Sequence, residues 1–288
     1  MRATKLKLTK KRTKYVQQFK PTHLLGTPLA NPAPLEERYA KTLKKLVESM
    51  TKEVEKEIEK LYKTPEAKQY FTQDASVASQ ARILMNSLQS KFDDMFGRAS
   101  QIIASRMVND ADKASKSALA QSLKSMSGGL TIKTNINSAD LRETVKGSIA
   151  QNISLIKSIP AEYLQKVSGA VYRSVTSGQG MADLKPQIQK YGDMTERRAK
   201  NVALDQTRAA YNSINADRMR KVGIRRFKWV HSGGGLHPRE DHMRMSGEIY
   251  SLDDPPIIDQ KTWQRGLPGI LPGCKCFMIP LIEFEQNE

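Results

Sequence analysis

The residue types that bind metal ions are gathered in the last third of this 288-residue chain. His237 and His242 precede Cys274 and Cys276, and the two cysteines are separated by one residue. Imidazole nitrogens and thiolate sulfurs are the ligands of structural zinc sites. In an extended segment the side chains at positions i and i+2 point to the same side, so both sulfurs can face one ion. The sequence therefore predicts that these four residues lie close together.

Two interpretations of this group stay open. In the first, the four residues hold a structural zinc ion, although the cysteines are closer in sequence than the usual spacing of about two to four intervening residues. In the second, Cys276 begins a buried strand, Cys274 packs beneath the preceding loop and the histidines are hydrogen-bonding loop residues. A disulfide between neighbours this close would be strained. No cofactor is certain from the sequence, and structural zinc is the one that these residues could hold.

A metal-dependent enzyme acting on DNA is the alternative chemistry. Its centre would be His231, His237 and His242, with nearby carboxylates at Glu240, Asp241, Asp253 and Asp254. No regular element places two of these carboxylates together, and Asp-Asp-Pro-Pro at 253–256 is typical of a turn. The triple glycine at 233–235 lacks the downstream Lys-Ser/Thr of a phosphate-binding loop. We therefore predict no catalytic residue and leave the enzyme question open, with a non-enzymatic role favoured.

The charge of the chain points to a polyanionic partner. Forty-seven Lys and Arg against 30 Asp and Glu give a net charge of +17, and residues 1–20 carry cations without any acid. Such a segment is typical of an arm that contacts the phosphates of double-stranded DNA without sequence preference. We expect no membrane contact, because the sequence has no apolar run of about 18 residues. The arm's cations are Arg2, Lys5, Lys7, Lys10, Lys11, Arg12, Lys14 and Lys20.

The middle of the chain has the periodicity of amphipathic helices. After a Pro-rich linker at 21–34, apolar residues recur every three or four positions over 35–62, over 77–108 and again from 138. The series at 77–108 places Ile102 on its apolar face. Pro160 is expected at the start of a further helix, which ends near the Ser-Gly-Gln-Gly segment at 177–180. A buried stripe is predicted on the first helix, formed by Leu43, Leu46, Met50, Val54 and Ile58.

Beyond residue 190 the pattern changes from helix to short strands. Thr195 is expected to cap a helix that ends before Gly223, and strands are predicted at 226–230, 248–250 and 276–279. Asp205 and Arg208, three residues apart, are expected to join a polar network that anchors this helix to the strands. The predicted fold class is α+β, with a mainly helical N-terminal body and a small C-terminal α+β module. The expected domains are 1–34 (arm and linker), 35–190 (helical) and 191–288 (α+β module).

Seven ordered segments of the C-terminal region resemble one family. They lie at 191–199, 203–207, 227–229, 237–242, 245–250, 253–256 and 272–276, and read YGDMTERRA, ALDQT, FKW, HPREDH, MSGEIY, DDPP and PGCKC. Together they resemble the phage Mu F-like family of minor head, or head morphogenesis, proteins over about 191–280. Lys275 stands where Arg is usual, which keeps the charge but loses the bidentate fork of a guanidinium.

The resemblance implies a structural and interaction role rather than an established enzymatic activity. It implies a virion component present in few copies at the portal or inside the head, made in the host cytoplasm. The expected partners are the portal protein, the major capsid protein or both, together with packaged DNA during assembly or delivery. Assembly into a homo-oligomer is a further expectation, because the apolar stripe on the first helix could be covered by another chain.

Overall fold

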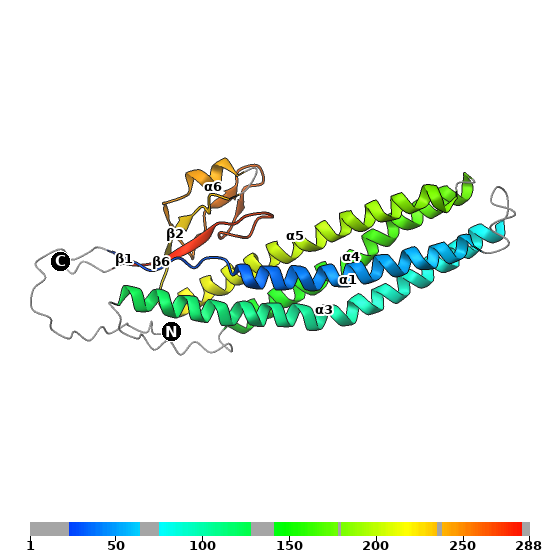
Figure 1. Ribbon diagram of the computed structural model, residues 1–288. Helices are drawn as coiled ribbons and strands as arrows, with labels where there is room; N and C mark the ends of the chain where they lie inside the picture. The colour runs from blue at the N-terminus through cyan, green and yellow to red at the C-terminus, as the bar shows by residue number, and fades with distance from the viewer. Residues whose placement is uncertain (1–22, 64–74, 128–140, 178–179, 235–237, 284–288) are drawn as a thin grey trace, which may run out of the picture. The chain divides into compact units, whose positions relative to one another are not determined.

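The computed structural model describes residues 23–63, 75–127, 141–177, 180–234 and 238–283. After the short strand β1, long helices precede the other strands along the chain, which confirms the α+β fold class (Figure 1). The helices are α1 (Ala33–Tyr62), α3 (Ala75–Met126), α4 (Arg142–Thr176), α5 (Met181–Lys221) and α6 (Glu240–Arg244). The strands are β1 (His23–Leu25), β2 (Arg226–Val230), β3 (Ile249–Ser251), β4 (Ile257–Asp259), β5 (Gln264–Arg265) and β6 (Phe277–Glu283). None of the described helices has the length and apolar character needed to cross a membrane.

The chain folds into two compact units, each assembled from separate segments. One unit, here called the helical unit, comprises residues 34–107 and 148–206. The other, here called the sheet unit, comprises residues 1–33, 108–147 and 207–288. The domain boundaries expected at residues 34 and 190 stay a prediction about which segments fold on their own.

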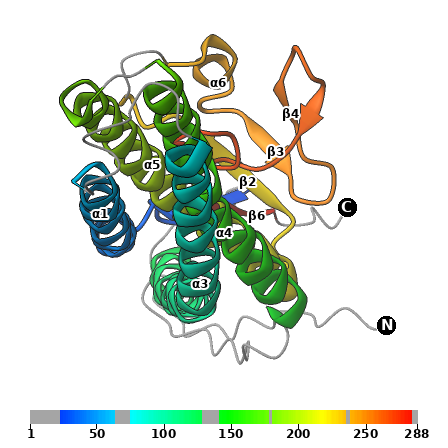
Figure 2. The same cartoon turned by 90° about the vertical axis from the view of Figure 1, so that its right-hand side faces the viewer.

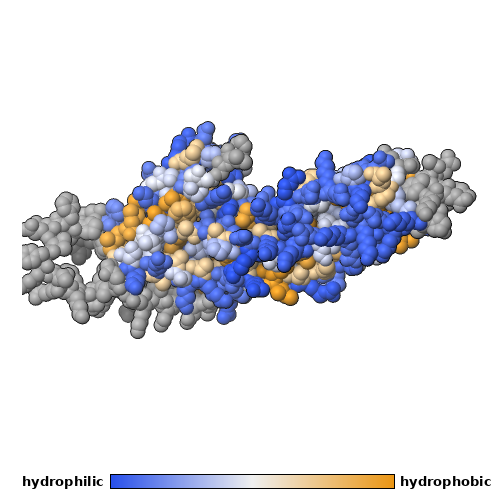
Figure 3. Space-filling model, viewed as in Figure 1, coloured by the Kyte–Doolittle hydropathy of each residue, from blue (hydrophilic) through white to orange (hydrophobic). Residues whose placement is uncertain are grey.

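Burial of apolar helix faces holds the helical unit together. Leu43, Met50, Val54 and Ile58 of the predicted stripe are fully buried, whereas Leu46 is half-buried and the adjacent Val47 takes the inner position. The stripe is covered by its own chain, so its burial needs no second copy. The opposite faces carry charges that pair between helices, as Lys185 does with Glu55 and Glu59 at 2.9 and 3.0 Å. Hydrophilic residues accordingly cover much of the visible helical surface in Figure 3.

Three sequence-based expectations about the helices are wrong. Pro160 lies inside α4 rather than at a helix start, and its neighbours Ile156 and Ile159 are buried. Packing of that face outweighs the cost of an internal proline, about 3 kcal/mol. Thr195 is inside α5, where its hydroxyl donates back to the Tyr191 carbonyl at 2.7 Å instead of capping a start. Ile102 is exposed, because the apolar face of α3 continues through Ala104.

The sheet unit is built on a four-stranded antiparallel sheet. Its strand order is β1-β6-β2-β3, and β4 pairs with β5 in a separate two-stranded sheet. The predicted strand at 226–230 is confirmed, and alternation along it turns Phe227 and Trp229 inward. These rings pack with Leu119 and Leu123 of α3 and with Met219 of α5 in one apolar core. The Pro-rich linker supplies β1, which pairs with β6 at the edge of the sheet.

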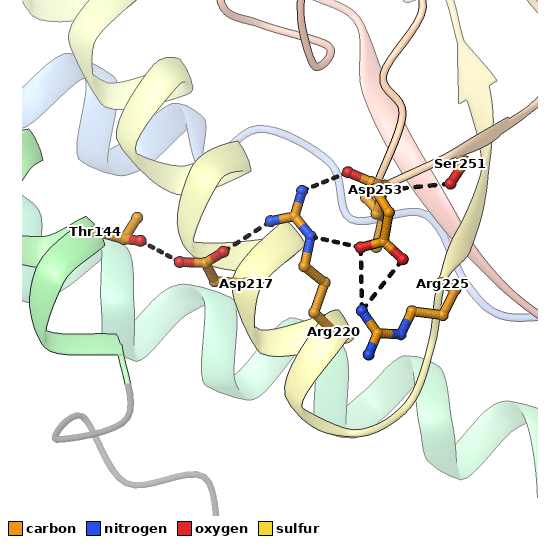
Figure 4. Close-up of polar contacts among 7 residues, drawn as sticks. Thr144, Asp217, Arg220, Arg225, Ser251 and Asp253 are labelled. Atoms are coloured by element: carbon orange, nitrogen blue, oxygen red, sulfur yellow. Dashed lines mark hydrogen bonds and ion pairs between the residues drawn. The ribbon is translucent and has the colours of Figure 1, made fainter. Parts of the chain in front are cut away.

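A chain of polar contacts ties the ends of α4 and α5 to the strands of the sheet unit (Figure 4). The Thr144 hydroxyl donates to Asp217, whose carboxylate also accepts from Arg220 at 2.8 Å. Arg220 lies 3.5 Å from the carboxylate of Asp253, which accepts from Arg225 at 3.0 Å. The turn at 253–256 is therefore held by arginines from α5 and the segment before β2.

Candidate metal centre

Three of the four predicted ligands meet in the sheet unit. His242 lies on α6, Cys274 lies in the turn before β6, and Cys276 immediately precedes that strand. The His242 Nδ1 atom lies 3.4 Å from the Cys274 sulfur and 3.6 Å from the Cys276 sulfur. All three ligand atoms lie within 4.8 Å of one another, and all three residues are buried. His237 lies outside the described residues, so its place at this group stays a prediction.

Local backbone geometry turns both sulfurs to the same side. Cys274 and Cys276 are buried while Lys275 between them is exposed, the alternation expected of an extended segment. Arg239, which precedes α6, donates to the carbonyl of Pro272 at 2.9 Å and so ties the histidine segment to the cysteine turn. Asn31 donates to the carbonyl of Lys275 at 3.0 Å.

The surroundings of His242 decide which of its nitrogens faces the sulfurs. Its Nε2 lies 3.0 Å from the carbonyl oxygen of Ile258 in β4, which can only accept, so Nε2 carries the hydrogen. The Nδ1 lone pair is then directed toward the two cysteines. The Trp229 ring meets the imidazole edge to face at a centroid distance of 5.2 Å and fixes its plane. Figure 2 shows α6 with the strands β2, β3 and β4 of this unit.

The three groups shift one another's pKa values in opposite directions. The pKa of Cys274 is lowered to about 4, because Cys276 donates a hydrogen bond to its sulfur and His242 adds a further stabilising contact. The pKa of Cys276 is raised, since its proton is held by the Cys274 sulfur and burial disfavours a second charge. Burial lowers the pKa of His242, but the Cys274 hydrogen bond and charge outweigh it and leave the pKa above its ordinary value.

Gly269 holds the loop that lies against the Cys274 sulfur. Its N–H donates to that sulfur at 3.4 Å, and its φ of +81° belongs to the region that favours glycine. A Cβ atom at this position would lie 2.5 Å from the Asn212 Nδ2 atom. The Asn212 amide is itself engaged, because it donates to Asn31 and to the Arg208 carbonyl, both at 3.0 Å. The loop therefore has no room for a side chain at residue 269.

Replacing Gly269 with alanine is expected to destabilise the sheet unit by more than about 2 kcal/mol. About 1–2 kcal/mol comes from the positive φ, and displacing Asn212 from its hydrogen bonds adds to it. Gly223→Ala is the matched control, because Gly223 also has a positive φ, +85°, but a Cβ there meets nothing within 4 Å. Urea denaturation of both variants checks this, and equal losses of stability would show that Asn212 imposes no constraint.

The other predicted site residues lie apart from this group. The Nδ1 of His231 accepts from the N–H of Gly233 at 3.1 Å. Of the carboxylates considered for a hydrolytic centre, Asp241 pairs with Arg244, Asp253 with Arg225 and Asp254 with Arg265. Among the described residues, no carboxylate joins His242 and the cysteines.

The predicted polar network and the predicted DNA-binding arm both stay predictions. Asp205 and Arg208 both lie on α5, and Arg208 is buried. Both residues have interaction partners, and their role in anchoring the helix stays a prediction. All eight cations of the arm lie outside the described residues.

Sequence reasoning missed the residues that support the site. Asn31, Asn212 and Gly269 form its outer contacts, yet only weak signals mark them in the sequence. Asn31 stands before a proline in the linker, and Asn212 is an amide within a helix that is otherwise amphipathic. Neither pattern indicates a contact between segments 181 residues apart.

Comparison with known proteins bears on the same region. Residues 165–279 match the model of the family described as Phage Mu protein F like protein, which confirms the resemblance noted from the sequence. The chain is also 30% identical over 251 residues to an uncharacterized protein of Haemophilus influenzae. That alignment covers 86% of this chain and 54% of the relative, so the chain spans about half the length of the curated relative that it matches. No solved structure matches the chain.

Proposed function

We propose that this chain, similar over residues 165–279 to the Phage Mu F-like proteins, is a phage head morphogenesis protein carried in the virion as a minor capsid component. The family match is the observation that carries the proposal, because it spans α5, the strands β2 to β5, the start of β6, and His242 with both cysteines in one continuous segment. The portal protein, the major capsid protein or both are its proposed partners, at the portal or inner head. The helical unit buries the apolar stripe of α1 within its own chain, and such a unit suits a building block of an assembly.

The charge of the chain supports contact with packaged DNA. The eight cations of residues 1–20 account for almost half of the net charge of +17. Duplex DNA carries one negative charge per about 1.7 Å of helix axis, and cations that neutralise phosphates release condensed counterions. The arm would then bind the genome without sequence preference while the folded units contact protein.

Particle composition tests the structural role. In a phage that encodes the chain, an antibody or mass spectrometry should detect it in purified heads in few copies per particle. Disruption of its gene should yield particles that are misassembled or deficient in DNA, and a plasmid copy should restore them. Infectious, DNA-filled heads that assemble without the chain would contradict the proposal. The metal-dependent enzyme remains an alternative that no specific observation on the described residues favours.

Neutralising the arm is expected to flatten the salt dependence of DNA binding. Replacement of all eight cations by glutamine should change the slope of log affinity against log salt by up to about seven units, given a slope near 0.9 per phosphate contact. Fluorescence anisotropy with two unrelated duplexes at several salt concentrations measures this. A variant with the arm residues in shuffled order keeps the charge and should bind like the original. An unchanged slope after neutralisation would assign the arm to a protein partner.

A further inference from the structure

Distances between the sulfurs and the imidazole nitrogen match the spacing of ligands around one tetrahedral ion. Zinc binds sulfur at about 2.3 Å and nitrogen at about 2.0–2.1 Å, so tetrahedral angles place a sulfur and a nitrogen ligand about 3.6 Å apart. The observed Nδ1-to-sulfur distances are 3.4 and 3.6 Å. The three atoms are thus already spaced as ligands of a single ion.

Hydrogen bonds and a shared cation are two ways to bring these three atoms together. With its hydrogen on Nε2, facing the Ile258 carbonyl, the imidazole offers a single lone pair at Nδ1. Only one thiol can donate to that lone pair, so the other must donate elsewhere, for example to the neighbouring sulfur. A cation between them satisfies all three atoms at once, because both thiols then lose their protons to solvent and the sulfurs become ligands.

The outer contacts are those of a metal-binding histidine. Histidine ligands generally donate their second ring nitrogen to a carbonyl or carboxylate, which fixes the tautomer and orientation. Here the Ile258 carbonyl provides that acceptor at 3.0 Å, and the N–H of Gly269 points at the Cys274 sulfur. Both cysteines and His242 are buried, so the group is built into the core rather than displayed on a loop.

Ligand chemistry selects the metal. Two thiolates and an imidazole suit zinc, whereas magnesium, calcium and manganese prefer oxygen ligands, and iron–sulfur clusters usually need four cysteines. Among the described residues no carboxylate joins the group. We propose that the sheet unit binds one zinc ion through His242 Nδ1 and the sulfurs of Cys274 and Cys276, and that this ion links α6 to the start of β6.

Metal analysis of the full chain, purified without chelators or a His tag, tests the proposal. We expect about one zinc per chain, falling to less than about 0.1 in Cys274→Ser, Cys276→Ser and His242→Gln, because a structural site depends on each ligand. His231→Gln is the matched control, since His231 lies near the group in sequence but outside it, and it should keep its zinc. Wild-type protein without bound metal, or equal zinc in wild type and the double cysteine variant, would overturn the proposal.

A second measurement does not depend on whether ligand variants fold. Chelated wild-type protein reconstituted with Co²⁺ should show the sulfur-to-cobalt charge-transfer absorption of thiolate ligands and the intense visible bands of tetrahedral cobalt. Metal should also protect both thiols from alkylation, and chelation should lower the melting temperature of the sheet unit. A cobalt spectrum without charge transfer, or two thiols that react equally fast with and without zinc, would show that the cysteines are not ligands.

Discussion

Replacing Asp112 with alanine is expected to destabilise the sheet unit by about 3–5 kcal/mol, because it leaves the buried guanidinium of Arg218 without its counter-ion. The Arg218 side chain is 3% exposed and pairs with the Asp112 carboxylate. Its Nε donates to the Ser115 hydroxyl at 3.2 Å. These contacts join the last part of α3 to α5. Both helices contribute residues to the apolar core of the sheet unit.

Tryptophan fluorescence during urea denaturation measures this loss of stability in the sheet unit. Both tryptophans belong to the sheet unit, and Trp229 is fully buried there. Glu143→Ala is the control within the same unit, because Glu143 pairs with Lys146 at the surface and such pairs contribute at most about 1 kcal/mol.

The double variant Asp112→Leu/Arg218→Met separates charge from packing. Apolar residues of similar volume often replace a buried ion pair with little loss or a gain in stability. The double variant should therefore be more stable than Asp112→Ala. If Asp112→Ala costs no more than Glu143→Ala, the buried guanidinium does not depend on its partner and the prediction fails.

Replacing Val54 with aspartate is expected to unfold the helical unit. Val54 is fully buried in the stripe of α1, and an unpaired carboxylate there costs several kcal/mol, a large share of the stability of an ordinary domain. Far-UV circular dichroism measures the effect, since α1 and much of α3, α4 and α5 should lose helicity. The tryptophans do not report on this unit, because neither lies in it.

Ile102→Asp provides the matched control for this change. It introduces the same charge in place of an apolar residue of the same unit, but Ile102 is 73% exposed. Its melting temperature should stay close to that of the original chain. Sedimentation of both variants tests the expected homo-oligomer. Retained helicity and melting temperature in Val54→Asp would show that the buried face of α1 has been misassigned.

Local patterns in the sequence determined the elements but not every boundary. The spacing of apolar residues at three and four positions predicted α1, and inward-facing aromatic residues at alternate positions predicted β2. Those signals are local, because a side chain's position on a helix or strand depends only on its number along the element. Pro160 and Thr195 misled for the same reason: a proline or a threonine marks a helix start only where tertiary packing does not continue the helix past it.

For the candidate metal site, too, some features followed from the sequence and others only from the tertiary structure. Residue types alone indicated a group of histidines and cysteines, and the Cys-x-Cys spacing alone indicated that both sulfurs share one side. Only the tertiary structure decided that the Nδ1 of His242 faces them, because that depends on the Ile258 carbonyl from β4 and the Trp229 ring from β2. Likewise, only the fold brings Asn31 to Asn212 and Gly269 to the Cys274 sulfur. These contacts join segments far apart in the chain, and no local periodicity encodes the pairing of one distant segment with another.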